Sequence, residues 1–162
     1  MNTIEQLKSL NQKSTSIAEH FPVISYIGDP VLRQKAALVS FDQGMATAKE
    51  LADILIAYRT LTGSGRGLAA PQIGKAQAVF VTYTEDTIQI YLNPQLSIIT
   101  EETNLYKECC ISSNHLWCDV ERPSEVTLTF TDNNNQLVTC HYQGFMARLI
   151  QHEYDHLLGL VN

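Results

Sequence analysis

The chain lacks several features that would assign it to a particular class of protein. It has no low-complexity run and no internal repeat, and no apolar stretch approaches the roughly 18 residues that a membrane-spanning helix needs. Residues 1–21 contain no apolar core of a signal peptide, and their lack of arginine argues against a transit peptide. With 162 residues, the chain is expected to form one domain in the cytoplasm.

Basic residues are in the minority, because 11 lysines and arginines stand against 17 aspartates and glutamates, for a net charge of −6. A surface that binds the phosphate backbone has the opposite excess, so stable nucleic-acid binding is not expected. Cysteines are also few, four in all. In a cytosolic chain of this size they are expected to be metal ligands, catalytic residues or buried thiols rather than disulfides.

The spacing of apolar residues predicts an α+β fold. Helices are expected over residues 3–11, 46–61 and 145–158. Strands are expected over residues 78–83, 88–92, 125–132 and 137–142. The second strand is expected to end at Asn93-Pro94. In the third, Val126, Leu128 and Phe130 share one face and threonines the other. The order of helix, strands and helix indicates the α+β class.

The stretch QHEYDH, residues 151–156, places two histidines four residues apart. On a helix, His152 and His156 lie on one face, one turn apart, and can bind one metal ion. Glu153 would project toward the same region, where its carboxylate can accept a proton from a water molecule. The alternative is a surface helix with two solvated histidines, but the flanking leucines and isoleucine favour burial.

A catalytic metal centre usually has three protein ligands, so a third ligand is expected from upstream of the histidine pair. The candidates are the carboxylates, His20, His115, His141 and the four cysteines. The segment ECCISS, residues 108–113, is the densest of them and would add one thiolate to two imidazoles. Neighbouring side chains of a strand point to opposite faces, so at most one of Cys109 and Cys110 is expected to face the site.

The remaining cysteines and histidines are expected to have no chemical role. Cys118 and Cys140 are interpreted as buried core thiols. The three histidines outside the helix motif are interpreted as structural or surface residues.

The segment GRGLAAPQIG, residues 65–74, is rich in glycine. Gly65 and Gly67 allow close approach of the backbone or unusual dihedral angles, and Gln72 offers a neutral side chain with two N–H donors. A phosphate-binding loop is not expected, because the Gly-Lys-Ser/Thr sequence and a following helix pattern are missing. The alternative is a glycine-rich loop that leads into a strand.

Three segments together resemble the peptide deformylase family. That family carries a Gly-x-Gly-Leu-Ala-Ala-x-Gln motif, a Glu-Gly-Cys-Leu-Ser motif and a helix motif of the HExxH type, in that order. Here they read GRGLAAPQ (65–72), ECCIS (108–112) and QHEYDH (151–156). Weaker similarity extends over roughly residues 26–160. The resemblance implies a single domain over residues 1–162, with residues 1–22 as an N-terminal extension and antiparallel β-sheets packed around a central C-terminal HExxH helix.

The resemblance also implies an activity and a cofactor. The activity is metal-dependent hydrolysis of the N-formyl group from the formyl-methionine of newly made peptides, which releases formate. The implied metal ligands are Cys110, His152 and His156. The implied ion is Fe²⁺ in the cell, and Zn²⁺ or Ni²⁺ are compatible with the same donors.

Further roles follow from the same resemblance. Glu153 would be the general base and then the acid, while Gln72 and the backbone N–H of Ile111 would hold the developing oxyanion. Glu108 and Arg122 would form a supporting ion pair. The implied substrate-binding residues are Gly65, Gly67, Leu68 and Cys109.

Cys109 departs from the family, which has glycine at this position. If relatives use that glycine for a positive φ, a Cβ there costs about 1 kcal/mol. If they use it for close approach of the substrate, Cys109 narrows the cleft; otherwise its side chain points into the core. Asn114 and Trp117 replace a Pro and an Arg that often line the entrance in relatives, which could alter the range of peptides that enter.

These departures keep other functions open. One is a deformylase-like protein with altered substrate or reduced activity. A second is a metal-storing or redox-sensing protein that uses Cys109 and Cys110, and a third is an HExxH peptidase. The sequence leaves the oligomeric state open.

Overall fold

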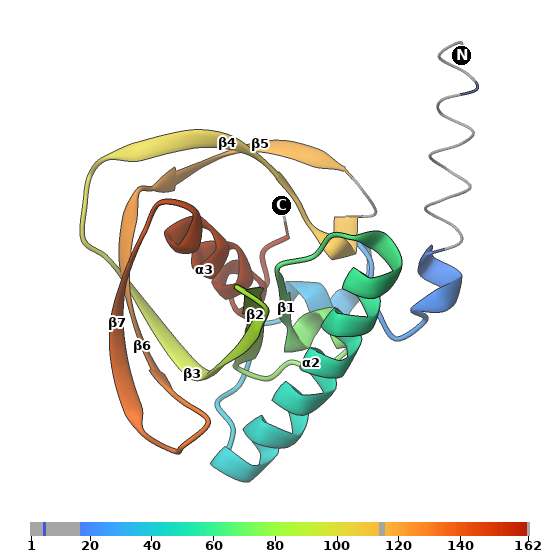
Figure 1. Cartoon of the computed structure of the whole chain (residues 1–162), viewed down its shortest axis with the longest axis horizontal. Coiled ribbons are helices and arrows are strands. Elements are labelled where there is room, and N and C mark those ends of the chain that lie inside the picture. Colours follow the sequence, from blue (N-terminus) through green and yellow to red (C-terminus); the bar gives the residue numbers. More distant parts are fainter. Residues whose placement is uncertain (1–4, 6–16, 114–115, 162) are drawn as a thin grey trace.

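The computed structural model describes residue 5 and residues 17–113 and 116–161. The helix expected over residues 3–11, most of the N-terminal extension, Asn114 and His115 lie outside these described residues. Figure 1 gives the arrangement of the described elements. The long α-helices of the described chain are α2 (Phe41–Thr62) and α3 (Gly144–Leu157), and residues 17–20 are also helical. Three short 3₁₀ helices are η1 (Pro30–Arg33), η2 (Ala70–Ile73) and η3 (Ile111–Ser113).

Both α-helices occur where the sequence predicts them, with shifted ends. Helix α2 begins five residues before the predicted Ala46, because Ser40 caps it: its hydroxyl accepts a hydrogen bond from the Gln43 N–H. The helix ends at Gly63, whose φ of 72° is a left-handed conformation that glycine adopts without strain. Helix α3 begins at Gly144 and carries the two histidines of the QHEYDH stretch.

The described strands form one five-stranded antiparallel sheet and one separate hairpin. The sheet has the order β1-β2-β3-β6-β7, and the hairpin pairs β4 with β5. The strands are β1 (Gly67–Ala69), β2 (Val79–Thr84), β3 (Thr87–Ile98), β4 (Thr103–Cys109), β5 (Trp117–Pro123), β6 (Glu125–Thr131) and β7 (Leu137–Gln143). The four predicted strands are confirmed as β2, β3, β6 and β7. Sequence reasoning missed β1, β4 and β5.

Strand β3 does not end at Asn93-Pro94, so that prediction is wrong. The strand continues to Ile98, with a register shift between Leu92 and Gln95 that accommodates the proline. Asn93 adopts a φ of 50° at this bulge. Its side chain accepts a hydrogen bond from the Val39 N–H at 2.9 Å and donates one to the Val39 carbonyl at 2.8 Å.

Two apolar clusters pack against the sheet, and one of them fixes the position of α3. One cluster joins α3 to the inner face of the sheet; its fully buried members include Phe80, Tyr91, Val126, Leu128, Phe130 and Ile150. The other joins α2 to the opposite face of β1 and β2. Strand β2 alternates between them, with Phe80 in the first cluster and Val79 and Val81 in the second. Helix α3 therefore lies within the curve of the sheet and the hairpin, while α2 covers the outside (Figure 1).

This arrangement confirms the α+β class with a central C-terminal helix. The predicted common face of Val126, Leu128 and Phe130 is also confirmed. Among the cysteines, Cys140 packs partly buried against the core, but Cys118 is exposed on β5, so its interpretation as a core thiol is wrong. All four cysteines are free thiols.

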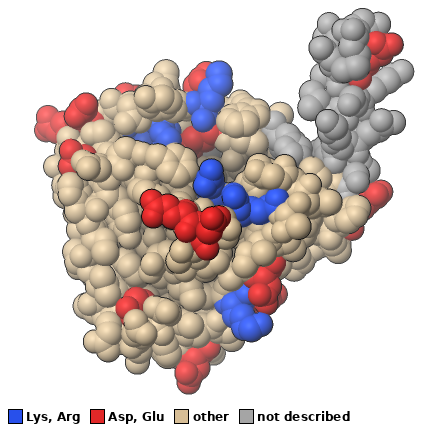
Figure 2. Space-filling view, in the orientation of Figure 1, with Lys and Arg blue, Asp and Glu red and all other residues tan. Residues whose placement is uncertain are grey.

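Two features of the described surface bear on partners. In the part of the chain that the structure covers, no helix combines the length and apolarity needed to span a membrane. On the face drawn in Figure 2, lysines and arginines lie among aspartates and glutamates rather than in one basic patch.

Replacing Asn93 with alanine tests the bulge in β3. The substitution removes both hydrogen bonds to Val39 and the side chain that tolerates a positive φ. We expect Asn93→Ala to lower the free energy of unfolding by about 2–3 kcal/mol, measured by urea denaturation.

Asn135→Ala is the matched control. Asn135 also has a positive φ, of 60°, but it is exposed in the turn between β6 and β7. Replacing Asn135 with alanine should lower the free energy of unfolding by about 1 kcal/mol. Equal losses in the two variants would contradict the role assigned to the Val39 hydrogen bonds.

Candidate metal centre

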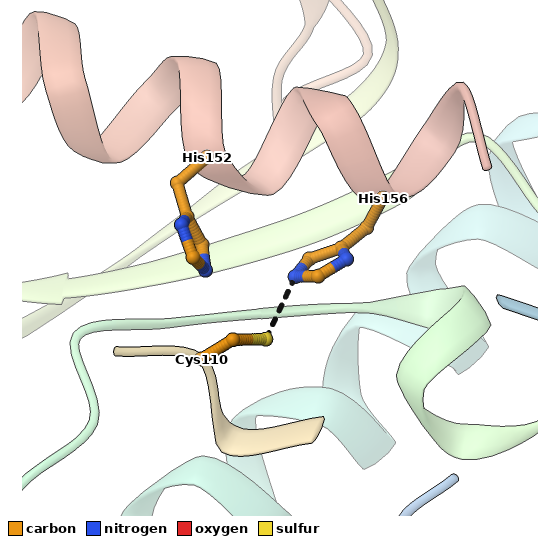
Figure 3. A group of neighbouring side chains, drawn as sticks. All are labelled: Cys110, His152 and His156. Atoms are coloured by element: carbon orange, nitrogen blue, oxygen red, sulfur yellow. Dashed lines mark hydrogen bonds between the residues drawn. The ribbon is translucent and has the colours of Figure 1, made fainter. Parts of the chain in front are cut away.

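The three predicted ligands lie together in the interior of the molecule. One ligand atom from each of Cys110, His152 and His156 lies within 4.8 Å of the other two, and all three side chains are buried (Figure 3). Cys110 Sγ is 3.3 Å from His156 Nε2. The histidines come from successive turns of α3, and Cys110 follows the last residue of β4. The hairpin therefore brings the thiol to the helix, as a tetrahedral metal site with three protein ligands requires.

Hydrogen bonds to the outer nitrogens fix the orientation of both imidazoles. His152 Nδ1 lies 2.9 Å from Glu108 Oε2, and His156 Nδ1 lies 3.1 Å from the carbonyl oxygen of Leu160. Both Nδ1 atoms are thus placed to donate, and the Nε2 atoms face Cys110 (Figure 3). Such outer partners orient metal-binding histidines and select the tautomer that can coordinate.

Glu108 is the centre of a buried network of charges. Its Oε1 accepts from Arg122 Nε at 2.7 Å and its Oε2 from Arg122 Nη2 at 2.8 Å, so the predicted ion pair is confirmed as a two-point contact. Arg148 Nη1 also donates to Oε1. Arg122 Nη1 donates to Asp155 at 2.8 Å. Burial alone would raise the pKa of Glu108, but the hydrogen bonds from His152 and Arg122 outweigh it and hold that pKa well below its usual range.

The Glu153 carboxylate is buried beside the ligands. Its Oε2 has no hydrogen-bond partner among the described residues, and burial raises the pKa of the group to about 7. Gly67 leaves room for it, since a Cβ at that position would lie 2.2 Å from Glu153 Oε1. Gly65 is needed for a different reason, a φ of 93°. A carboxylate with a pKa near neutrality is suited to accept and return a proton.

The amide of Gln72 is held in one orientation. Its Oε1 accepts from the Ala69 N–H at 2.8 Å, and its Nε2 lies 3.2 Å from Ser112 Oγ and 3.5 Å from Cys110 Sγ. The N–H groups therefore face the thiol side of the centre. This places a neutral donor beside the ligands, where it can bind an oxygen that gains negative charge.

A cavity of about 620 Å³ opens onto this group of side chains. Of the predicted site residues, it is lined by Gly65, Gly67, Gln72, Cys109, Cys110, Ile111, His152 and Glu153. His156 and Leu68 are not among its lining residues, and Leu68 is buried in the cluster beneath α2.

Sequence reasoning missed several other side chains that line the cavity, among them Tyr58, Tyr106, Phe145 and Arg148. Tyr106 comes from the unpredicted strand β4, so no sequence pattern placed it there. Tyr58 lies on α2, within the helix that the apolar spacing predicts, but that spacing does not indicate that its side chain reaches the cavity.

Cys109 is not held in a strained conformation. It is absent from the positive-φ residues of the described chain, so the expected cost of a Cβ in a left-handed conformation does not arise. Its side chain is half-buried and it lines the cavity, whereas the neighbouring thiol of Cys110 faces the histidines. Burial raises the pKa of the Cys109 thiol. The two adjacent cysteines thus occupy different surroundings.

The donor set fits a divalent transition metal. A thiolate with two imidazoles, each oriented by an outer hydrogen bond, suits iron, zinc or nickel. Burial lowers the pKa of His156 to about 3, which keeps it neutral. For His152, burial is outweighed by hydrogen bonds to Cys110 and Glu108, and its pKa rises to about 10.

Comparison with known proteins supports this chemistry. The family model described as polypeptide deformylase matches residues 22–162 of the chain. The peptide deformylase of Treponema pallidum (strain Nichols) is 35% identical over 141 residues, which cover 86% of this chain and 80% of that protein.

Solved structures agree in fold as well as in sequence. The crystal structure of peptide deformylase from Thermus thermophilus has a TM-score of 0.77 and 32% identity, covering 86% of this chain and 81% of that one. A probable peptide deformylase from Synechococcus phage S-SSM7 has a TM-score of 0.75 and 34% identity, covering 85% and 95%. With the cysteine and two histidines in place, the chain belongs to the peptide deformylase family.

Proposed function

We propose that the chain hydrolyses the N-formyl group from the N-terminal formyl-methionine of newly made peptides and releases formate. The observation that carries this proposal is the cluster of Cys110, His152 and His156 with the buried carboxylate of Glu153 beside it, all at one cavity or directly behind it. Family membership supports the reaction, and the cavity of about 620 Å³ is large enough for a methionine side chain and the start of a peptide.

Cys110, His152 and His156 would hold one divalent metal ion. We propose Fe²⁺ in the cell, with Zn²⁺ or Ni²⁺ as alternatives in purified protein, since one thiolate and two imidazoles accept each of them. When bound, the ion supplies Lewis acidity, which makes water acidic near neutral pH and polarises a carbonyl oxygen.

Glu153 carries the proton in this proposal. Its carboxylate removes a proton from the water molecule that attacks the formyl carbon and returns it to the nitrogen of the leaving amine. Both transfers require a group whose pKa is close to the working pH, and the pKa of Glu153 is about 7 because the side chain is buried. The products are formate, which contains the oxygen of the water molecule, and a free amino terminus, which receives the proton carried by Glu153.

Two groups are proposed to hold the carbonyl oxygen as it gains negative charge. They are the Gln72 amide N–H, already oriented by Ala69, and the backbone N–H of Ile111. Gly65, Gly67, Leu68 and Cys109 are proposed to contact the substrate. For Gly65, Gly67 and Cys109, the position on the cavity wall supports this role. For Leu68, whose side chain is buried in the core, only the strand backbone is available.

The proposed partner is the formylated end of a nascent peptide in the cytoplasm. Stable binding to nucleic acid is not proposed, because the net charge of −6 disfavours the phosphate backbone.

Formate release from the peptide formyl-Met-Ala-Ser tests the function directly. The wild-type protein, purified without oxygen and loaded with Fe²⁺, should release formate steadily. Glu153→Ala should bind the metal but lose about 10²–10⁴-fold in rate, because the proton carrier is gone. Absence of release by folded, metal-loaded wild type would contradict the proposal and favour a relative with an altered substrate.

The stability of the metal-free protein should depend on Glu153 in a pH-dependent way. Its pKa is raised from 4.5 to about 7 on folding, so the protonated form stabilises the native state below pH 4.5 and this contribution is lost as the pH rises through 7. Glu153→Gln removes the ionisation. We expect the variant to be more stable than wild type at pH 8 by on the order of 3 kcal/mol, and no more stable at pH 4. A difference that is the same at both pH values would contradict the burial of an ionising carboxylate.

Gly67→Ala should disable the centre without unfolding the sheet. The added methyl group would lie 2.2 Å from Glu153 Oε1, so the carboxylate must move away from its place beside the ligands. We expect formate release to fall by about 10²-fold, as with other displacements of a catalytic group by about 1 Å. Zinc binding should persist, since the atoms nearest to this methyl group belong to Glu153 and not to a ligand; unchanged activity would contradict the proposed position of Glu153.

A further inference from the structure

Arg148 lies on α3 one turn before His152, on the same face of the helix. Its side chain is only 12% exposed and extends from the helix to both strands of the β4–β5 hairpin. Nη2 donates to the carbonyl oxygen and the Oδ1 of Asn104, both at 2.8 Å, and both Nη atoms donate to the Val120 carbonyl at 3.1 Å. The guanidinium also lies 5.2 Å from the centre of the Tyr106 ring.

The same guanidinium reaches the carboxylate that orients His152. Arg148 Nη1 donates to Glu108 Oε1, while Glu108 Oε2 lies 2.9 Å from His152 Nδ1. Arg148 and His152 thus hold the two oxygens of one carboxylate from a single helix. The planar fork of an arginine can make these contacts at once, because its N–H groups point in fixed directions.

Arg122 does not make this contact redundant. It comes from β5 rather than from α3, and it shares its fork between Glu108 and Asp155. Two carboxylates and two guanidinium groups therefore balance each other in this buried network. Without Arg148, one arginine would face two carboxylates, and Glu108 would lose its only arginine contact from α3.

We propose that Arg148 is a positioning residue for the metal centre. Its guanidinium fixes Glu108 Oε1 relative to α3 and to the hairpin, so that Glu108 Oε2 stays aimed at His152 Nδ1 and His152 Nε2 stays turned toward Cys110. This inference rests on the metal site proposed above. Arg148, which lines the cavity, would thus orient His152 through Glu108 without touching His152 itself.

The affinity of the metal-free protein for Zn²⁺, measured by competition with a chelator, tests this role. Arg148→Met keeps much of the side-chain volume but removes the donors, and we expect zinc to bind about 10–100-fold more weakly. Arg148→Lys keeps the charge but cannot reach Glu108 and the two carbonyl oxygens together, so its affinity should be intermediate. The visible spectrum of the Co²⁺ forms should change in the same order, because it reports the geometry of the ligands.

Gln151→Met is the matched control. Gln151 also joins α3 to the hairpin, through a hydrogen bond from Nε2 to the Pro123 carbonyl at 3.0 Å, but its other side-chain hydrogen bond is to the Ala147 carbonyl and not to Glu108. Its zinc affinity should equal that of wild type. An equal loss in the Gln151 and Arg148 variants would overturn the proposal, since docking of the hairpin in general would then explain the effect.

The remaining outcomes are also decisive. Wild-type zinc affinity in folded Arg148→Met would overturn the proposal. If that variant does not fold, Arg148→Lys provides the test. Weaker zinc binding than in wild type supports the positioning role of Arg148, and equal zinc binding overturns it. A wild-type chain that binds no Zn²⁺ would contradict the metal site itself, which distinguishes failure of the proposed function from failure of this inference.

Discussion

The buried carboxylate of Glu108 is the contact on which the centre depends. It lies two residues before Cys110 on the hairpin and accepts from His152 on α3, so it links the elements that supply the thiol and the imidazoles. A buried charge is costly unless it is paired and fully hydrogen-bonded. Four N–H groups satisfy it, two from Arg122 and one each from Arg148 and His152. The hairpin must therefore close on the helix in one arrangement.

The parts of the site that follow local rules could be predicted from the sequence. The spacing of His152 and His156 places them on one face of a helix whatever surrounds it. The alternation of side chains that a strand would impose allowed only one of the adjacent cysteines to face the site, and motif resemblance selected Cys110, which lies just after the end of β4. The apolar alternation of β6 predicted the buried face of the sheet, because a half-buried strand must repeat every two residues.

The parts that depend on distant contacts could not be predicted in the same way. Strands β4 and β5 are mostly exposed, so their side chains carry no clear apolar pattern. Strand β3 continues past its proline because residues 95–98 pair with β6, while Val39, far away in sequence, forms hydrogen bonds with the Asn93 side chain at the bulge. The reason for glycine at position 67 is the carboxylate of Glu153, which sequence spacing does not reveal.

The most direct test of this dependence is the zinc affinity of Glu108→Gln beside that of wild type. The substitution keeps the shape of the side chain and removes its charge, so Arg122 and Arg148 lose the carboxylate that they share. We expect zinc to bind at least about tenfold more weakly, with formate release reduced in the same preparations. Zinc affinity and formate release equal to those of wild type would contradict the central place given to this carboxylate.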